Sequence, residues 1–413
     1  MKHYALREEM NEIEDPPRKT WFWELGEAVI DADRCVGCGT CVAVCPSNSI
    51  GVSAESGMPE LVKMCTGCSL CWDFCPRAGL RYEATWLDDA RGGETGAPEP
   101  ATPWSISGQD PGEGLGQVLE AVAVRALDPV RGAQDGGAVT TLLAALLAAG
   151  AIDGALVSKP SAAPDETWKG VATVATSVAE LRAAAGSFYN QTMALAALDL
   201  SGVVLPPDPR LAVVGTPCEV QGLRAMQLRP WPTGAHRVDA VSLSIALFCT
   251  KSFDYEALVV GELERTRGIS IDQIARIDVT RGRFIVDDKS GQRVVDEPVR
   301  EFLGASLKGC NECADFAGRA ADLSVGSVGS ADGWTTVLVR TPRGRAMLDV
   351  ARDSFEVADL HEADALLRLD ALNASIARRT LGRELEPSGP MFIPYGEHPE
   401  PVAPSRTPVV VGR

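Results

Sequence analysis

The cysteine pattern Cys-x-x-Cys-x-x-Cys-x-x-x-Cys-Pro occurs twice near the start of this chain. The first copy lies in "RCVGCGTCVAVCP", residues 34–46, and the second in "MCTGCSLCWDFCP", residues 64–76. Three thiolates with this spacing can surround one face of an iron–sulfur cube when the loop between them curls around it. The fourth cysteine, which precedes proline, points away and binds the other cluster. The pattern therefore predicts a bacterial-type ferredoxin module with two 4Fe-4S clusters.

Crossed ligation gives each cluster three cysteines from one copy and the fourth from the other copy. The first set is Cys35, Cys38, Cys41 and Cys75, and the second set is Cys65, Cys68, Cys71 and Cys45. A zinc site is the alternative interpretation, but zinc motifs usually join two Cys-x-x-Cys units over a longer gap, with four ligands in all. Two complete copies that each end in Cys-Pro favour the clusters.

Composition limits the classes of function. The chain has 413 residues, 45% of them hydrophobic and 23% charged, as in an ordinary globular protein of two or three domains. Its net charge of −17 argues against nucleic acid as a partner. The longest apolar stretch, residues 138–152, is shorter than the roughly 20 residues that span a bilayer. The N-terminus also lacks the apolar core of a secretory signal.

We therefore expect a cytoplasmic protein. Any contact with the inner membrane face would be peripheral and made through a partner complex. Because thiols stay reduced in the cytoplasm, the 12 cysteines indicate metal or redox chemistry rather than disulfides.

The N-terminal part of the chain divides into an extension and the ferredoxin module. Residues 1–27 are a polar extension that ends in the aromatic run "WFW" at 21–23, which we expect to pack on the module or on a partner. Residues 28–86 hold the module, and residues 28–35 are expected to form its opening strand and turn.

The remainder is predicted to be a linker, a large domain and a tail. Residues 87–116 are rich in Gly, Pro and acidic residues, as linkers are. Residues 117–383 alternate apolar runs with helical patterns, which predicts an α/β domain on a central sheet. In this domain, residues 117–127 are typical of a strand or a short helix. Residues 384–413 form a proline-rich tail. The predicted fold class is thus a two-cluster ferredoxin domain (α+β) followed by an α/β domain.

Four cysteines remain outside the two copies. Cys218 and Cys249 each end a predicted buried strand, and Cys310 and Cys313 form a further Cys-x-x-Cys. Open α/β sheets gather their sites at the carboxyl ends of strands, so the four cysteines can converge and bind a third 4Fe-4S cluster. The alternatives are that Cys218 and Cys249 are buried apolar residues, or that the four thiols hold zinc.

Several uncommon phrases then occur in the order of a known family: "GTPCEVQGL", "LFC", "LKGCNECADF" and "ADLSVGSVGSADGWTTVLVRTPRG". Over most of residues 117–345 the chain resembles the family of coenzyme F420 hydrogenase and dehydrogenase beta subunits. The resemblance implies bound FAD, the third cluster, and hydride transfer to or from the deazaflavin coenzyme. With two ferredoxin clusters ahead of this domain, the chain is similar to the electron-input subunit of F420H2 dehydrogenases. Those proteins pass electrons to a membrane quinone or phenazine complex, or to a fused reductase.

The resemblance also implies flavin contacts in four segments. They are the Gly-Gly turn before a helix in "QDGGAVTTLL", the loop "AAGSFY", the "TPC" turn and the segment "GSVGSADGWTT". The implied residues are Gly136, Gly137, Ala138, Thr140, Gly186, Ser187, Tyr189, Thr216, Gly329, Ser330, Gly333 and Trp334. Each of them also fits an ordinary turn or core position. The first loop departs from the Ser-Gly-Gly phrase of the family, which weakens the contact at Asp135.

The anionic coenzyme requires a basic pocket on this acidic chain. The candidates are Lys251, Arg281 with Arg283, and Lys308, and ordinary surface charge is the alternative for each. Because F420H2 gives up a hydride and clusters accept single electrons, a flavin must stand between them. No side chain needs to act as a nucleophile, so no catalytic residue is predicted.

We therefore expect F420H2 oxidation through FAD and three 4Fe-4S clusters, with electrons passing to a redox partner. One alternative is a ferredoxin-dependent flavoprotein reductase of an organic substrate. The other is an electron-transfer subunit that has clusters but no flavin and no catalysis.

Overall fold

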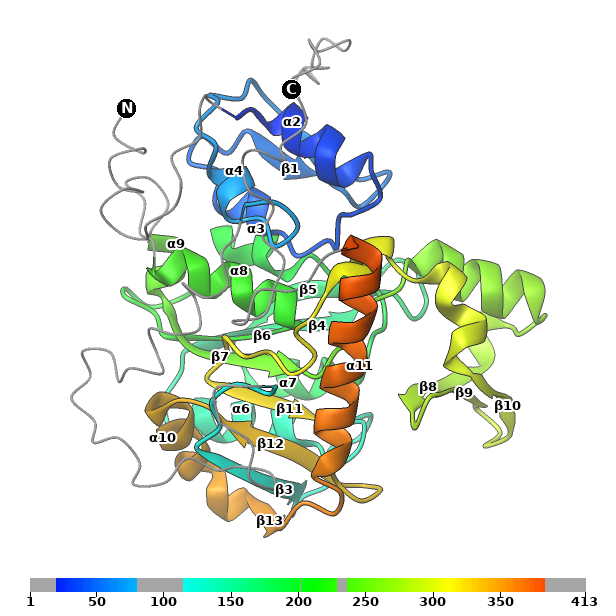
Figure 1. The fold of residues 1–413 in the computed structure, drawn as a ribbon. Helices are drawn as coiled ribbons and strands as arrows, with labels where there is room; N and C mark the ends of the chain where they lie inside the picture. The colour runs from blue at the N-terminus through cyan, green and yellow to red at the C-terminus, as the bar shows by residue number, and fades with distance from the viewer. Residues whose placement is uncertain (1–19, 80–113, 201, 229–235, 383–413) are drawn as a thin grey trace.

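A small N-terminal module lies over one side of a large α/β domain (Figure 1). The computed structural model describes residues 20–79, 114–200, 202–228 and 236–382. Most of the predicted linker, the start of the N-terminal extension and the whole proline-rich tail lie outside the described residues.

The ferredoxin module begins with a helix. Residues 28–35 were predicted to form a strand and a turn; the strand was wrong, whereas a turn is present at residues 31–33. Helix α2 (Phe22–Leu25) continues directly as the π-helical turn η1 (Gly26–Ile30). Phe22, Leu25 and Val29 are buried, and their spacing of three and four residues is that of a helix face. The Glu24 carboxylate accepts the Trp21 N–H at 2.6 Å and so helps to begin the helix.

The repeat in the sequence becomes a repeat in the structure. Two short helices, α3 (Thr40–Ala43) and α4 (Leu70–Asp73), each carry the third cysteine of one copy. Both follow a residue in the left-handed region, Gly39 at φ 79° and Ser69 at φ 68°. The hairpin of β1 (Ile50–Val52) and β2 (Pro59–Leu61) joins the two halves.

The large domain is built on a mixed sheet with the strand order β13-β3-β12-β11-β7-β6-β4-β5. In chain order the strands are β3 (Glu120–Ala126), β4 (Gly154–Pro160), β5 (Gly170–Ala175), β6 (Leu211–Gly215), β7 (Val241–Leu247), β11 (Leu323–Gly326), β12 (Thr335–Val339) and β13 (Phe355–Ala358). Strands β4, β6, β7 and β11 are parallel neighbours, whereas the remaining pairings are antiparallel. The segment predicted as a strand or a short helix is the strand β3.

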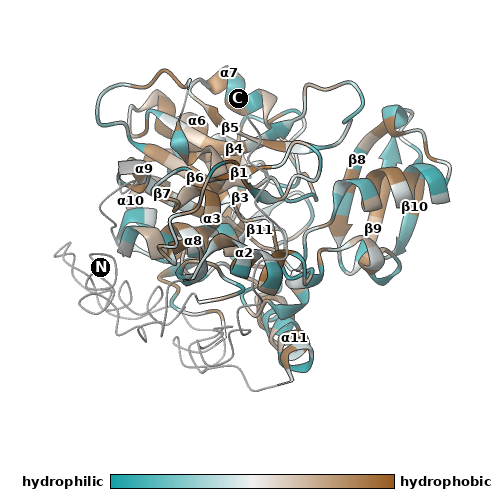
Figure 2. Cartoon of the chain, turned by 90° about the horizontal axis from the view of Figure 1, so that it is seen from above, coloured by the Kyte–Doolittle hydropathy of each residue, from teal (hydrophilic) through white to brown (hydrophobic). Residues whose placement is uncertain are grey.

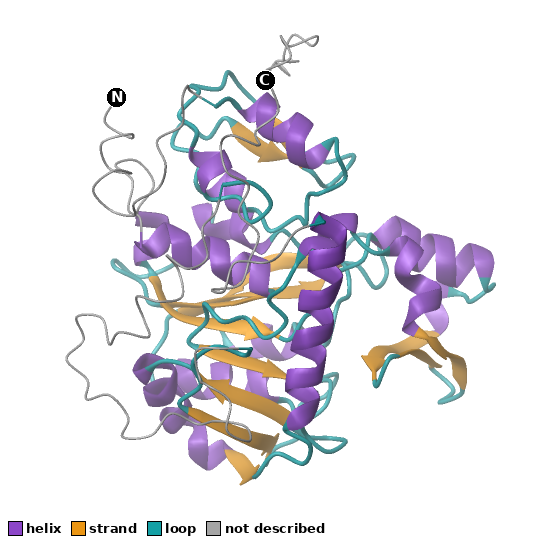
Figure 3. Ribbon diagram, viewed as in Figure 1, coloured by secondary structure: helices purple, strands orange, loops and turns teal. Residues whose placement is uncertain are grey.

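Helices cover both faces of this sheet (Figure 3). One face packs against α6 (Ala138–Ala148), α7 (Val178–Ala183) and α10 (Pro342–Ala351). The other face carries the 3-10 helix η2 (Ala194–Asp199), α8 (Pro217–Leu228), α9 (His236–Asp239) and the long α11 (Asp364–Leu381). Because both faces are covered, β6 is buried at every residue. Hydrophobic residues, brown in Figure 2, gather in this central part of the domain.

A lobe between β7 and the last two cysteines projects from the domain (Figure 1). It has a three-stranded sheet in the order β10-β9-β8 with its own apolar core. Its elements are η3 (Glu256–Thr266), η4 (Ile271–Gln273), β8 (Ile274–Thr280), β9 (Arg283–Asp288), β10 (Arg293–Pro298) and η5 (Val299–Ala305). This lobe was not predicted as a unit separate from the large domain.

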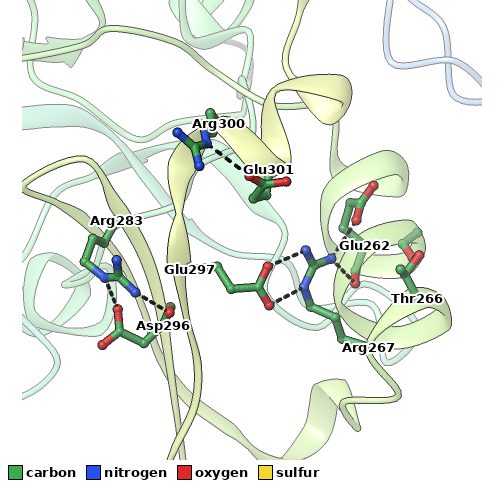
Figure 4. Close-up of polar contacts among 9 residues, drawn as sticks. Glu262, Thr266, Arg267, Arg283, Asp296, Glu297, Arg300 and Glu301 are labelled. Carbon is green, nitrogen blue, oxygen red and sulfur yellow. Dashed lines mark hydrogen bonds and ion pairs between the residues drawn. The ribbon is translucent and has the colours of Figure 1, made fainter.

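Charged pairs fasten the elements of the lobe to one another (Figure 4). Arg267, at the end of η3, contacts Glu262 at 2.6 Å and Glu297 of β10 at 2.8 Å. Its guanidinium also lies 4.2 Å from the centre of the Phe302 ring, so it covers the core from solvent. Arg283, one of the predicted basic residues, pairs with Asp296 on the next strand.

None of the helices among the described residues is both long and apolar enough to cross a membrane.

Candidate functional site

The structure places the cysteines of each predicted ferredoxin set next to one another. Burial raises the pKa of the Cys41 thiol well above its ordinary value, and the thiols of Cys38, Cys35 and Cys75 raise it further. These are the members of the first set. Their role as ligands stays a prediction.

The second set is arranged in the same way. Burial raises the pKa of the Cys71 thiol, and the neighbouring thiols of Cys68, Cys65 and Cys45 add to the shift. Cys71 also contributes to the pKa shift of Cys41, which places the two sets side by side.

Backbone amides point at the sulfurs at equivalent places in the two copies. The Gly37 N–H donates to Cys35 Sγ, and the Gly67 N–H donates to Cys65 Sγ, both at 3.4 Å. The two glycines have φ of 63° and 66°, a conformation that glycine adopts without strain. Amides in these positions stabilise negative charge on sulfur, as a cluster ligand requires.

The fourth cysteine of each copy receives the same kind of contact. The Ser49 N–H donates to Cys45 Sγ at 3.2 Å, and the Arg77 N–H donates to Cys75 Sγ at 3.4 Å. Grouped thiols with amide donors are a suitable ligand set for 4Fe-4S clusters, so the residues fit the group that the motif predicts.

The other four cysteines come from three places in the large domain. Cys218 lies in the first turn of α8, just after β6, and Cys249 lies just after β7. Cys310 lies on the 3-10 helix η6 (Lys308–Glu312), and Cys313 follows it directly. Burial raises the pKa of Cys249, and the thiols of Cys310 and Cys313 raise it further. Cys218 belongs to a buried cluster against which Cys310 packs.

This third group of cysteines adjoins the first ferredoxin set. Cys218 and Cys38 share one buried cluster with Val36. The pKa of the Cys35 thiol is raised to about 11, mainly by burial; two thiols contribute to the shift, Cys38 of its own set and Cys310 of the third group. The three groups therefore follow one another in the order third group, first set, second set. Within the described ranges, no three His, Cys, Asp or Glu side chains are close enough together to hold a single metal ion.

The ferredoxin module meets the large domain with close backbone contacts. A Cβ atom on Gly309 would lie 2.0 Å from the carbonyl oxygen of Arg34, and one on Gly222 of α8 would lie 2.0 Å from Thr40 Oγ1. The Arg34 guanidinium also donates to both carboxylate oxygens of Glu312, at 2.7 and 2.8 Å. Apolar residues of both parts share one core cluster.

The predicted flavin turn lies against the end of the sheet. The Gly136 N–H donates to Thr335 Oγ1 at 3.1 Å, and a Cβ atom on Gly136 would lie 2.4 Å from the Val124 oxygen. Gly137, at φ 68°, is the N-cap residue of α6. Because glycine has no side chain, it provides no capping hydrogen bond to the first backbone amides of the helix, which begin at Ala138. Thr140 follows in the same first turn.

Tyr189 ties this turn to the projecting lobe. Its hydroxyl accepts from the Val279 N–H at 2.9 Å and from Gln134 Nε2 at 3.2 Å, and it donates to Asp278 Oδ1 at 3.4 Å. Burial raises the pKa of the Tyr189 hydroxyl, and the Asp278 carboxylate adds to this. Ser187 lines a small pocket beside Tyr189 with Trp168.

The remaining predicted flavin residues lie in neighbouring loops. Gly186, at φ 143°, approaches Gly132, which precedes the flavin turn. Gly329 and Gly333 have φ of 92° and 79°, and both lie in the loop before Thr335, the first residue of β12. Ser330 shares a hydrogen bond of 2.6 Å with Thr336, and the Trp334 ring lies 4.7 Å from the Arg125 guanidinium.

Thr216 links the cysteines to a buried carboxylate. Its hydroxyl lies 3.1 Å from Cys218 Sγ and 3.1 Å from Glu219 Oε2, and its N–H donates to the same carboxylate oxygen at 2.7 Å. Glu219 also accepts the Ala194 N–H at 3.0 Å, so it fixes the turn after β6.

The predicted basic residues lie in two places. Lys308 pairs with Asp33 of the ferredoxin module, and Lys251 donates to Asn311, so both flank the third cysteine group. Burial lowers the pKa of Lys251, and the nearby thiols oppose that shift. Arg281, on the lobe, contacts Asp332 at 2.7 Å with both side chains exposed.

The residues that join these parts were not predicted from the sequence. They are Arg34, Arg77, Gln134, Glu219, Asp278 and Glu312. Each of them has at least one partner far away in the sequence. Only the position of Arg77 directly after Cys75-Pro76 gave a local signal.

Comparison with known proteins is consistent with this arrangement. Residues 28–80 match the model of a 4Fe-4S dicluster domain. Residues 121–199 and 208–363 match the N-terminal and C-terminal models of the coenzyme F420 hydrogenase/dehydrogenase beta subunit. The match defines an iron–sulfur protein of the F420-dependent oxidoreductases.

Individual relatives agree with the models. The beta subunit of coenzyme F420 hydrogenase in Methanothermobacter thermautotrophicus is 35% identical over 60% of this chain and 87% of its own length. A subunit of the F420H2 dehydrogenase of Methanosarcina mazei is 27% identical over 80% of this chain and 86% of its own length. The coenzyme F420-dependent sulfite reductase of Methanocaldococcus jannaschii is 30% identical over 88% of this chain, which spans only 53% of that protein.

The fold agrees as well. A chain of the F420-reducing [NiFe] hydrogenase complex from Methanosarcina barkeri matches with a TM-score of 0.60 and 27% identity, over 68% of this chain and 98% of that chain. The chain therefore belongs to the family of coenzyme F420 hydrogenase/dehydrogenase beta subunits.

Proposed function

We propose that this protein oxidises F420H2 by hydride transfer to FAD and passes the electrons singly through three 4Fe-4S clusters to a redox partner. The observation that carries this proposal is the contact between Cys218 and the first ferredoxin set, because it makes the three cysteine groups continuous. Family membership supports F420 as the coenzyme.

The chemistry of the bound groups is simple. The flavin converts one two-electron hydride step into two one-electron steps. The chain itself positions the groups that take part in the reaction. The loops that do so follow the carboxyl ends of β3, β6, β7 and β11, which lie at the same end of the sheet. Tyr189 and Asp278 hold the flavin turn to the lobe, while Glu219 fixes Thr216 beside Cys218.

The second ferredoxin set is our proposed exit to the partner. Cys65 and Cys68 of this set are half-buried, and the neighbouring Met64 is exposed. In the first set, Cys35 is half-buried, whereas Cys38, Cys41 and Cys75 are buried. The partner is another redox subunit; a membrane quinone-reducing complex is one candidate, and contact with the membrane would then be peripheral.

The test is anaerobic purification followed by addition of F420H2. We expect protein with FAD and about twelve iron atoms, the load of three 4Fe-4S clusters, and rapid bleaching of flavin and iron–sulfur absorbance. NADH and NADPH serve as controls that should not bleach it. Absence of bleaching in fully loaded protein would contradict F420H2 as donor, and absence of FAD would favour the electron-transfer subunit.

The third cluster is tested separately by Cys218→Ser. We expect iron to fall to about eight atoms per chain while both ferredoxin signals remain in the electron paramagnetic resonance (EPR) spectrum. Unchanged iron would show that Cys218 is not a ligand.

A further inference from the structure

Arg77 contacts the loops of two cysteine groups at once. Its N–H donates to the sulfur of Cys75 in the first ferredoxin set at 3.4 Å. Its side chain crosses to the large domain, where Nε donates to the Gly309 oxygen at 2.8 Å. Gly309 directly precedes Cys310 of the third group. One residue therefore spans the junction between the two groups.

The contact between Arg77 and Gly309 is buried. Arg77 is 1% exposed, and Gly309 lies so close to the Arg34 backbone that no side chain fits between them. A neutral amide would also donate to the Gly309 oxygen, so this hydrogen bond does not by itself require an arginine. A buried arginine keeps its charge, so Arg77 places a positive charge at the junction.

The charge of Arg77 lies between the two groups that it joins. Its backbone N–H reaches the sulfur of Cys75 in the first set, and its guanidinium reaches the carbonyl oxygen of the residue before Cys310 in the third group. The positive charge is therefore placed at the junction of these two groups.

We propose that Arg77 is a positioning residue for electron transfer: it holds the Gly309 loop against Cys75 and raises the reduction potential of the two clusters that flank it. Each such cluster gains one electron, and so one negative charge, when it is reduced. A buried positive charge nearby stabilises that reduced state. This inference rests on the proposed function, because the third group must hold a cluster for both effects to exist.

The test is an EPR-monitored redox titration of the full chain, purified anaerobically with its iron counted. The variants are Arg77→Gln, which removes the charge, and Arg77→Lys, which keeps it. Arg34→Gln is the matched control, since Arg34 bridges the same two segments through Glu312 but is 21% exposed. The Cys218→Ser variant identifies the signal of the third cluster.

We expect R77Q to lower the ratio of reduced to oxidised cluster at a fixed potential by tenfold or more at the two flanking clusters, which corresponds to a shift of about 59 mV for a one-electron couple. The second ferredoxin cluster should keep its potential in every variant. The reduction potentials of R77K and of R34Q should stay near those of the wild type.

Two results would overturn the inference. One is wild-type potentials in fully loaded R77Q. The other is loss of iron in both R77Q and a second neutral variant, R77M, with full iron in R77K, because the charge would then serve to assemble the loops rather than to set potentials. A wild-type load of about eight iron atoms would instead contradict the third cluster. The shift at the first ferredoxin cluster could still be measured in that case, so the two failures are distinguishable.

Discussion

Gly309→Ala is the most direct perturbation of the contact between the ferredoxin module and the large domain. The new Cβ atom would lie 2.0 Å from the Arg34 oxygen and 2.6 Å from the Arg34 carbonyl carbon, and both of these are backbone atoms. Ordinary contacts between carbon atoms are about 3.5–4.0 Å, so the two segments must separate by roughly 1 Å. That movement also stretches the two hydrogen bonds from Arg34 to Glu312.

The expected cost follows from this geometry. Overpacking in a well-packed site usually costs about 1–3 kcal/mol, and a clash between two backbones belongs at the upper end. A loss of about 3 kcal/mol lowers the melting temperature of a domain of this size by roughly 6–12 °C. Gly222→Ala provides a graded comparison, because its clash is with the Thr40 hydroxyl, a side-chain group that can rotate. We expect its cost to be about 1 kcal/mol.

The assay is anaerobic thermal unfolding followed by the visible circular dichroism of the iron–sulfur chromophores. Gly304→Ala is the matched control, because a Cβ atom there meets no other atom within 4 Å. We expect the melting temperatures to fall in the order G304A, G222A, G309A. If G309A melts together with G304A, the close approach at Gly309 does not hold the module in place, and the reasoning is refuted.

Three further predictions follow from single contacts. The Trp21 ring packs on the second cysteine loop, 2.9 Å from the position that a Cβ atom on Gly67 would take. Trp21→Ala should therefore expose this loop and speed the loss of visible absorbance in air. An unchanged rate of loss would contradict this. Burial raises the pKa of Asp370 to about 7, above its unfolded value, so the free energy of unfolding should fall as pH rises from about 4 to 7. Asp370→Asn should reduce the difference in unfolding free energy between pH 5 and 8 by at most about 3 kcal/mol. An unreduced difference would assign the pH dependence to other groups. The exposed pair of Lys308 and Asp33 should contribute no more than about 1 kcal/mol to the free energy of unfolding, so Lys308→Ala should have nearly the melting temperature of the wild type. A raised Michaelis constant for F420 in this variant would support Lys308 as a coenzyme contact, and an unchanged constant would exclude it.

The sequence was most informative where chemistry imposes a spacing. The repeated cysteine phrase predicted the ferredoxin module, which the match to a dicluster domain supports. The buried strands ahead of Cys218 and Cys249 were expected and are β6 and β7. The rule that sites gather at the carboxyl ends of parallel strands explains why these two cysteines approach the Cys-x-x-Cys loop.

Local patterns were least informative where distant segments meet. The helical spacing of Phe22, Leu25 and Val29 was present in the sequence, but the boundary predicted at residue 28 separated Phe22 and Leu25 from Val29. The lobe around Phe284 was not separated, because its short strands carry no special spacing. Arg77 and Gly309 are 232 residues apart, and no local pattern can indicate such a contact.

The enclosed junction also has a consequence for how the protein is made. Cys38 and Cys218 are buried against each other in the docked chain, and Arg77 and Gly309 are buried as well. A protein that delivers clusters would have no access to the thiols of Cys38 and Cys218 in this position. For the clusters proposed above, this implies an order of assembly: they would enter an open chain before the N-terminal module docks.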